Sequence, residues 1–123
     1  MQKISPELAR RRAMLWTHNV LAKQILEVGT SQIPKHTAEA LGMNPQARES
    51  APLWNVLSYE PWADYGWILW TTEHDALPES FTQQHPELAA LLKFAAGEGF
   101  LYLKLDCDAV CLPKELGFPV FQW

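Results

Sequence analysis

The stretch HPELAALLKFAAGEGFLYLKLD, residues 85–106, constrains the fold most, because the spacing of its apolar residues changes part-way along it. As far as Gly97, leucine and alanine recur at helical spacing, and Pro86 suits the first turn of a helix. Beyond Gly97 the leucines alternate with other residues, which predicts a strand that ends at Asp106. The predicted inner faces consist of Leu88, Leu91, Leu92 and Ala95 on the helix and Leu101, Leu103 and Leu105 on the strand.

A second strand is predicted for YGWILWTT, residues 65–72, which is rich in aromatic and β-branched residues. Its apolar residues do not alternate, so we expect cover on both faces and a central place in the sheet. A helix between two strands predicts a right-handed β-α-β unit. The expected fold class is α/β or α+β, a single small domain with a mixed sheet of three to four strands, helices packed on it and an N-terminal helix.

The N-terminal helix is predicted from about Pro6 to Lys23, because Ser5 suits the N-cap and apolar residues recur on one face. The next residues, QILEVGTS, leave two alternatives open: the helical period continues to Val28, or a short strand ends at Gly29. A short helix is expected between Pro34 and Gly42.

Proline and polar residues dominate the remaining connections. Residues 44–64 read as a loop in which WNVLSY is a possible short strand, and residues 73–87 read as a polar connection. The tail FPVFQW suits an edge strand, where a proline is tolerated.

The total of 123 residues, 48% of them apolar, suffices for one core. We therefore expect one domain over residues 1–123, with an N-terminal helix over 1–24 and a small α/β core over 25–123. The sequence has no apolar run of roughly 18 residues and no apolar signal segment at its start, which predicts a soluble, cytoplasmic protein. Residues 1–50 carry 7 basic and 4 acidic side chains, whereas residues 51–123 carry 3 and 10.

Asp106 and Asp108 follow a predicted strand, an arrangement that in some enzymes binds Mg²⁺ or supplies a nucleophile. Only fifteen residues follow Asp108, too few to complete such a site. The favoured interpretation is a turn in which the two carboxylates bind local backbone N–H groups. Cys107 and Cys111 have no second ligand pair nearby, so no metal and no cofactor are expected.

Thr30, Ser31 and His36 form a second weak candidate for a polar site, because the turn that carries them precedes a helix and suits anions. The basic run at Arg10, Arg11 and Arg12 supports DNA binding as another alternative. The acidity of the chain as a whole argues against this alternative.

The order VGTSQIPKHTAEAL, YGWILW, LPE, LAALLKFAAGEGFLYLKLDCDA and FQW, over about Ile25 to Trp123, resembles a family of small uncharacterised bacterial proteins carried on mobile genetic elements. The resemblance implies that residues 25–31 include a strand. It also implies a histidine in the turn that follows, where this chain has Ser31 or Gln32, and this difference puts any catalytic site in doubt.

The leading hypothesis is a binding or modulator protein without catalytic activity, whose partner is another protein. The candidate contact residues lie in SYEPWADYGW and are Tyr59, Trp62, Asp64 and Tyr65. Aromatic residues beside a proline are frequent in protein interfaces, and the acidic half of the chain suits a partner that itself handles nucleic acid. The alternatives are a small metal- or phosphate-dependent enzyme that uses Asp106 and Asp108, and a DNA-binding regulator. No membrane partner is expected.

Overall fold

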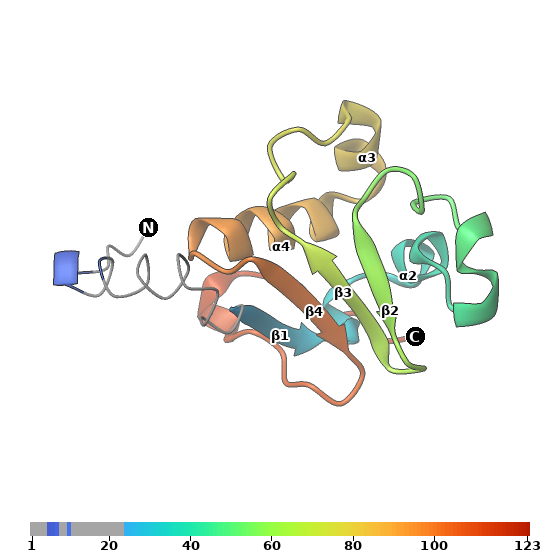
Figure 1. Cartoon of the computed structure of the whole chain (residues 1–123). Helices are drawn as coiled ribbons and strands as arrows, with labels where there is room; N and C mark the ends of the chain where they lie inside the picture. The colour runs from blue at the N-terminus through green and yellow to red at the C-terminus, as the bar shows by residue number, and fades with distance from the viewer. Residues whose placement is uncertain (1–4, 8–9, 11–23) are drawn as a thin grey trace.

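The computed structural model describes residues 5–7, 10 and 24–123 of the chain (Figure 1). The helix expected from Pro6 to Lys23 lies for the most part outside these residues. Four strands form one sheet in the order β1-β4-β3-β2. The strands are β1 Ile25–Gly29, β2 Tyr59–Trp62, β3 Gly66–Trp70 and β4 Tyr102–Asp106. The helices are α2 Lys35–Leu41, α3 Glu79–Gln84 and α4 Pro86–Gly97, with 3₁₀ turns at Thr30–Gln32, Pro45–Ser50 and Lys114–Leu116.

The sheet is mixed. β1 runs parallel to β4, whereas β3 is antiparallel to both of its neighbours, β4 and β2. The fold is therefore a small α+β domain, as the sequence predicts. Residues 25–29 form a strand rather than continuing the helical period of the preceding residues, which decides between the two alternatives for this segment.

One face of the sheet forms the core. Val28, Leu69, Leu103 and Leu105 alternate with residues of the opposite face and are almost fully buried. α4 covers this face with Leu88, Leu91, Leu92 and Ala95, the four residues predicted for its inner face. The helix begins at Pro86 and ends at Gly97, as predicted, and burial of its leucines supplies most of its stability.

The opposite face of the sheet carries Glu27, Lys104, Ile68 and Glu60 in one row across the four strands. Figure 1 shows α2 and α4 together on the other side of the sheet, so these helices leave this face uncovered. We call it the open face. Cover on both faces was expected for β3, and this prediction is wrong: Trp70 is 38% exposed, since it lies on the open face.

The predicted β-α-β unit is also wrong, because β4 is antiparallel to β3. The connection from β3 to β4 leaves the sheet and returns to it at the same end. There the Thr71 N–H donates to the Leu101 carbonyl at 3.0 Å. Residues 73–87, expected to be a polar connection, contain α3, and this extra helix lets the chain double back. β4 finds its parallel partner in β1 instead.

Two further strand predictions differ from the structure. Residues 54–56 of the expected WNVLSY strand form turns, and the strand begins only at Tyr59. The tail forms no strand among the described residues. Phe121 N–H donates to the Ser31 carbonyl and the Trp123 indole N–H donates to the Ile33 carbonyl, so the tail crosses the turn after β1.

β2 is an edge strand whose outer side is poorly suited to pairing with another chain. The Ser58 carbonyl accepts from Trp70 N–H, so alternate residues from Ser58 onward face β3. Tyr59 and Pro61 therefore present their backbone outward, where proline has no N–H to donate. A partner at this edge would have to bind through side chains rather than by adding a strand.

Candidate functional site

A cavity of about 290 Å³ lies at the end of the sheet where β1 and β4 terminate. We call it the hairpin cavity, because the turn between β2 and β3 forms one wall. Its lining includes Thr30 and Ser31 after β1, Asp64 and Tyr65 in the turn, and Cys107 after β4. Four predicted site residues from two separate stretches of sequence thus meet around one hollow.

The strand register explains this meeting. β1 and β4 are parallel and Gly29 pairs with Asp106, so the residues that follow both strands emerge at the same edge of the sheet. Gly66 also pairs with Asp106, and this pairing brings the β2–β3 turn to that edge. The Cys107 N–H donates to the Tyr65 carbonyl at 2.8 Å and holds the turn against the end of β4.

Apolar side chains supply most of the remaining lining. Trp67 is only 6% exposed, and its indole N–H donates to the Gly42 carbonyl at 3.1 Å, so its ring is held in place. Met43, Tyr65 and Trp123 stand at the rim and are 55%, 50% and 47% exposed. An apolar hollow with an exposed aromatic rim is typical of binding sites for ligands or for protruding side chains.

The chain end is fixed beside this cavity by hydrogen bonds to the turn after β1. Phe121 N–H donates to the Ser31 carbonyl at 2.6 Å, and the Trp123 indole N–H donates to the Ile33 carbonyl at 3.0 Å. The Gln32 side-chain carbonyl accepts from Leu112 N–H at 2.7 Å. These contacts make the tail part of the cavity wall.

Cys107 is the most reactive group in the lining by residue type. Partial desolvation, together with the charges of Asp108 and Asp106, raises the pKa of its thiol. The thiolate, which is the nucleophilic form, is therefore disfavoured. The lining contains no histidine, lysine or arginine, and every lining residue belongs to the described part of the chain. Among the lining residues, therefore, no side chain is of a type that would activate the Cys107 thiol as a nucleophile.

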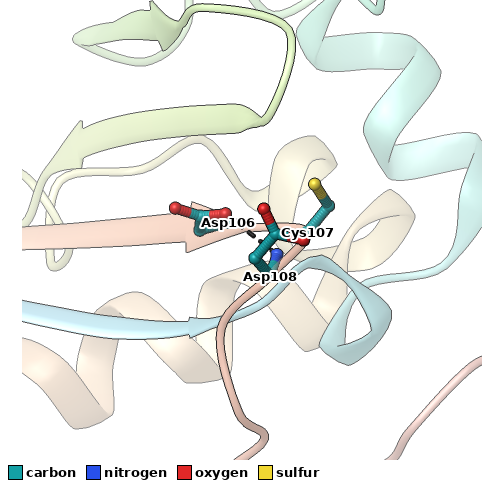
Figure 2. A group of neighbouring side chains, drawn as sticks. All are labelled: Asp106, Cys107 and Asp108. Carbon is teal, nitrogen blue, oxygen red and sulfur yellow. Dashed lines mark hydrogen bonds between the residues drawn. The ribbon is translucent and has the colours of Figure 1, made fainter.

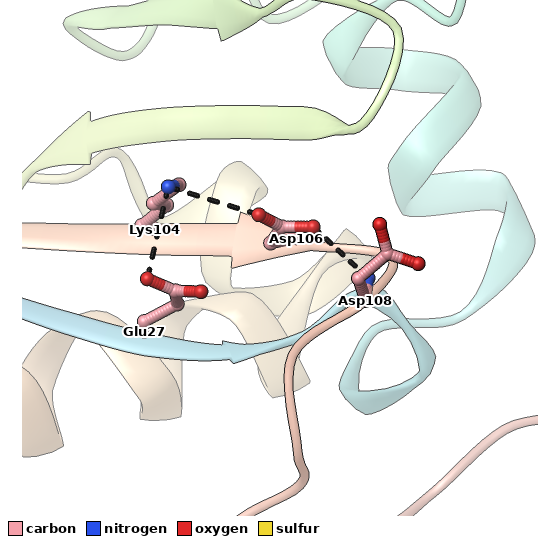
Figure 3. Close-up of polar contacts among 4 residues, drawn as sticks. All are labelled: Glu27, Lys104, Asp106 and Asp108. Atoms are coloured by element: carbon pink, nitrogen blue, oxygen red, sulfur yellow. Dashed lines mark hydrogen bonds and ion pairs between the residues drawn. The ribbon is translucent and has the colours of Figure 1, made fainter.

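Asp106, Cys107 and Asp108 are consecutive residues at the end of β4 (Figure 2), and their possible ligand atoms lie within 4.8 Å of one another. Asp106 accepts from Asp108 N–H at 2.9 Å through one carboxylate oxygen. Its other oxygen lies 3.7 Å from the Lys104 ammonium (Figure 3). Asp106, the last residue of β4, therefore binds a local backbone N–H group, as the favoured interpretation predicts for this one of the two aspartates. It would have to release Lys104 before its second oxygen could bind a cation.

Lys104 lies at the centre of the open face. Its ammonium is 3.7 Å from Glu27 as well as from Asp106 (Figure 3), and it lies over the ring of Trp62. Trp62 is 42% exposed, so its outer side remains accessible. The predicted contact residue Trp62 therefore belongs to the open face, whereas Asp64 and Tyr65 belong to the hairpin cavity.

Tyr59 is not a surface residue, contrary to its predicted role as a contact residue. It is 4% exposed and its hydroxyl donates to the Leu41 carbonyl at 2.7 Å. Burial raises the pKa of Tyr59 to about 12. Residues 60–64 were expected to lie in a loop, but residues 59–62 form β2 and residues 63–65 form the turn that leads into β3. Alternation along β2 turns Tyr59 into the core.

His36 does not join Thr30 and Ser31 in the cavity. Its Nε2 atom lies 3.0 Å from the Gln84 carbonyl, and its ring stacks on His85 with centroids 5.3 Å apart. His85 in turn bonds Thr37 Oγ1 at 2.8 Å. These contacts link α2 to the junction between α3 and α4, so His36 has a role in packing.

A family model described as the C-terminal domain of the family of unknown function DUF5983 matches residues 25–123. The chain belongs to the DUF5983 family. No curated protein and no solved structure matches the chain. Within the described residues, no helix combines the length and the apolar character that a membrane span requires.

The resemblance noted from the sequence implied a histidine after the first strand of the domain. In this DUF5983 domain that turn carries Ser31, which lines the cavity, and Gln32, which is 1% exposed. The Gln32 amide nitrogen is buried, and no hydrogen-bond partner for it lies within the part of the chain that the structure describes. Gln32 therefore acts mainly through its carbonyl, which holds Leu112.

The sequence did not indicate three cavity residues of this DUF5983 domain: Trp67, Cys107 and Trp123. The sequence predicts Trp67 as a strand residue covered on both faces, Cys107 as half of a weak candidate metal site, and Trp123 as part of an edge strand. The tryptophan at the end of FQW was the one sequence signal that could have indicated Trp123 as a cavity residue, because a large aromatic in an irregular segment often contacts a binding site.

Proposed function

We propose that this domain is a protein-binding module and that its hairpin cavity receives an apolar side chain of the partner. The observation that carries the proposal is the cavity itself, in which the buried ring of Trp67 lies behind the exposed rim of Met43, Tyr65 and Trp123. Anchors that fill such hollows dominate the energetics of many protein interfaces. The outward-facing Pro61 supports recognition through side chains rather than by strand addition.

The charge of the surface favours a partner with basic residues beside its apolar anchor. Asp64 lines the cavity and Asp108 follows the lining residue Cys107. Residues 51–123 carry 3 basic against 10 acidic side chains, so a basic partner would also associate faster. A host or element protein that itself handles nucleic acid fits this description.

The cellular setting is part of the same proposal. We infer an accessory protein of a bacterial mobile genetic element that inhibits or modulates its partner in the cytoplasm. The support for this setting is the resemblance given by the sequence pattern over Ile25 to Trp123. Sequencing the genes that flank this one in several genomes tests the setting; flanking genes of ordinary metabolism throughout would contradict it.

Binding is tested with variants of the cavity rim. The partner is identified by affinity purification from the native host, purified, and titrated with the wild type, Tyr65→Ala and Trp123→Ala. We expect each variant to weaken binding about tenfold or more, as truncation of an interface anchor does. Leu116→Ala is the matched control, because Leu116 is as exposed as Trp123 at 47% but does not line the cavity.

A further variant separates the cavity from the open face. Trp62→Ala removes an aromatic that is 42% exposed on the open face. If Trp62→Ala abolishes binding while Tyr65→Ala and Trp123→Ala bind normally, the partner uses the open face and the cavity proposal is wrong.

The second candidate function is a metal-dependent activity at Asp106, Cys107 and Asp108. The close spacing of their ligand atoms, all within 4.8 Å of one another, favours it. The engagement of both Asp106 oxygens and the raised pKa of Cys107 weigh against it. Calorimetric titration with divalent metals tests this candidate.

A further inference from the structure

The hairpin cavity combines an apolar base with a charged rim. Trp67, behind the rim, is 6% exposed, and its indole N–H is bonded to the Gly42 carbonyl. Asp64, Tyr65 and Trp123 line the same cavity and are exposed. Asp64 carries the one carboxylate among the described lining residues. A partner segment that places an apolar group at the base therefore meets a negative charge at the rim.

The carboxylate of Asp64 differs from that of the nearby Asp106. Asp106 accepts a hydrogen bond from Asp108 N–H and has an ion pair with Lys104. Within the part of the chain that the structure describes, no hydrogen bond and no ion pair engages the carboxylate of Asp64. The charge of Asp64 is therefore available to a cation of the partner.

The turn that carries Asp64 is held by contacts on both sides. The Tyr65 N–H donates to the Trp62 carbonyl at 2.9 Å, and the Cys107 N–H donates to the Tyr65 carbonyl at 2.8 Å. Ala63, the residue before Asp64, has a φ of 46°, a left-handed conformation that alanine adopts only when its surroundings hold it there. The backbone at Asp64 is thus fixed, so the turn loses little freedom when a partner binds.

Aromatic rings stand beside this carboxylate at the rim. Tyr65 and Trp123 are 50% and 47% exposed. A ring face attracts a cation, and the domain uses this attraction on its open face, where the Lys104 ammonium lies 4.0 Å from the centre of the Trp62 ring. Rings beside a carboxylate favour arginine over lysine, because a planar guanidinium can stack on a ring and donate two parallel hydrogen bonds to one carboxylate.

We propose that the partner carries an arginine next in sequence to the apolar side chain that fills the hairpin cavity, and that this arginine pairs with Asp64. The proposal rests on the function proposed above, since the cavity positions the apolar anchor and Asp64 adds a charged contact at the rim. Asp64 is then a specificity residue: it selects, among segments with a suitable apolar anchor, those with an adjacent arginine.

The test uses the full chain at low ionic strength and two probes, N-acetyl-Leu-Arg amide and N-acetyl-Leu-citrulline amide. Citrulline has nearly the shape of arginine but no charge. Binding is followed by NMR through the backbone N–H signals of Asp64 and Tyr65 and the indole N–H signal of Trp123. We expect the arginine dipeptide to bind about three- to tenfold more tightly than the citrulline dipeptide, and this ratio to fall as salt is added.

A conservative variant assigns this ratio to one carboxylate. Asp64→Asn keeps the shape of the side chain without its charge, so the two dipeptides should bind this variant equally. Its affinity for the citrulline dipeptide should equal that of the wild type. Asp75→Asn is the matched control, because Asp75 is also an exposed aspartate but does not line the cavity, and it should keep the wild-type ratio.

Three outcomes would overturn the proposal. One is equal affinity of the wild type for the two dipeptides, or no saturable binding of either. Another is a preference for the arginine dipeptide that persists in Asp64→Asn. The third is a dimer without probe that Asp64→Asn dissociates in sedimentation velocity, since the occupant would then be a second copy of this chain.

The apolar anchor is tested apart from the arginine. Equal binding of the two dipeptides removes the arginine contact and leaves the cavity as the anchor site. Normal binding of the purified partner by Tyr65→Ala and Trp123→Ala removes the anchor site itself. The failure of one proposal can therefore be told from the failure of the other.

Discussion

The ammonium of Lys104 lies 4.0 Å from the centre of the Trp62 ring, with two carboxylates on its other sides. The Lys104 side chain is only 14% exposed in its ion pair with Glu27, so this is a partly desolvated cation in the middle of the open face. Its contacts join β1, β2 and β4 across the sheet.

The Trp62–Lys104 contact should be measurable as a coupling energy. In a double-mutant cycle with Trp62→Ala and Lys104→Met, the two effects on the free energy of unfolding should deviate from additivity by about 0.5–1 kcal/mol. Urea denaturation of the four proteins measures it. Strict additivity would show that the ring and the ammonium do not interact in solution.

Gly66→Ala should destabilise the domain by about 2 kcal/mol or more, because a Cβ at Gly66 would lie 1.7 Å from the Leu105 carbonyl oxygen. The backbone of β3 or β4 must move to accept it. Gly97→Ala is the matched control, since a Cβ there meets no atom within 4 Å. We expect Gly97→Ala to be neutral or slightly stabilising in a urea titration; similar losses in both variants would contradict the close approach.

The free energy of unfolding should decrease as the pH falls below about 6.5, because the pKa of His85 is lowered in the folded domain. Burial is the main cause of this lowering, and the charge of His36 adds to it. The charge of Glu87 acts in the opposite direction. At a pH below the pKa that His85 has in the unfolded chain, its ring takes up a proton in the unfolded chain but stays largely neutral in the folded domain. The free energy of unfolding therefore decreases as protons are added.

The His85 prediction is checked by urea denaturation at pH 7.5 and 5.5. His85→Gln removes the titrating ring and should lose less stability between the two pH values than the wild type. Thr37 Oγ1 and the Phe81 ring also contact His85, so comparison within each protein across pH removes the effect of altered packing. Equal losses in both proteins would contradict the assignment to His85.

Titration of the purified protein with Mg²⁺, Mn²⁺ or Zn²⁺ should give no saturable heat. Asp106 already pairs with Lys104 and with Asp108 N–H, and the raised pKa of Cys107 disfavours the thiolate that zinc requires. A stoichiometric heat that disappears in Asp108→Asn would contradict this expectation and favour the metal-dependent candidate.

The spacing of apolar residues along the chain predicted those helices and strands whose buried face is formed by neighbouring residues of one segment. The change of spacing near Gly97 located both α4 and β4, because each apolar face is set by one period of the chain. Strand direction depends on the path of the connection. The polar residues 73–87 gave no sign of α3, so the antiparallel return to β4 could not be predicted from them.

The candidate site was predicted in parts. The sequence predicts Asp64 and Tyr65 as contact residues from the aromatic segment around Trp62, and Thr30 and Ser31 as polar site residues from the turn before a helix. Their meeting depends on the parallel pairing of β1 with β4, a contact between segments distant in sequence. Tyr59 was misjudged, because its neighbours Pro61 and Trp62 suggested a loop, and burial by strand alternation became visible only with the register of β2.

The hairpin cavity exists only when the whole domain is folded, since Ser31, Tyr65, Cys107 and Trp123 come from four distant segments. Occupancy of the cavity and folding are therefore linked equilibria. A peptide present at a hundred times its dissociation constant would stabilise the domain by about 2.7 kcal/mol. The melting temperature of the domain can thus report binding of candidate peptides before any partner is known. Trp123→Ala, which should bind about tenfold or more weakly, should reduce this stabilisation by about half or more.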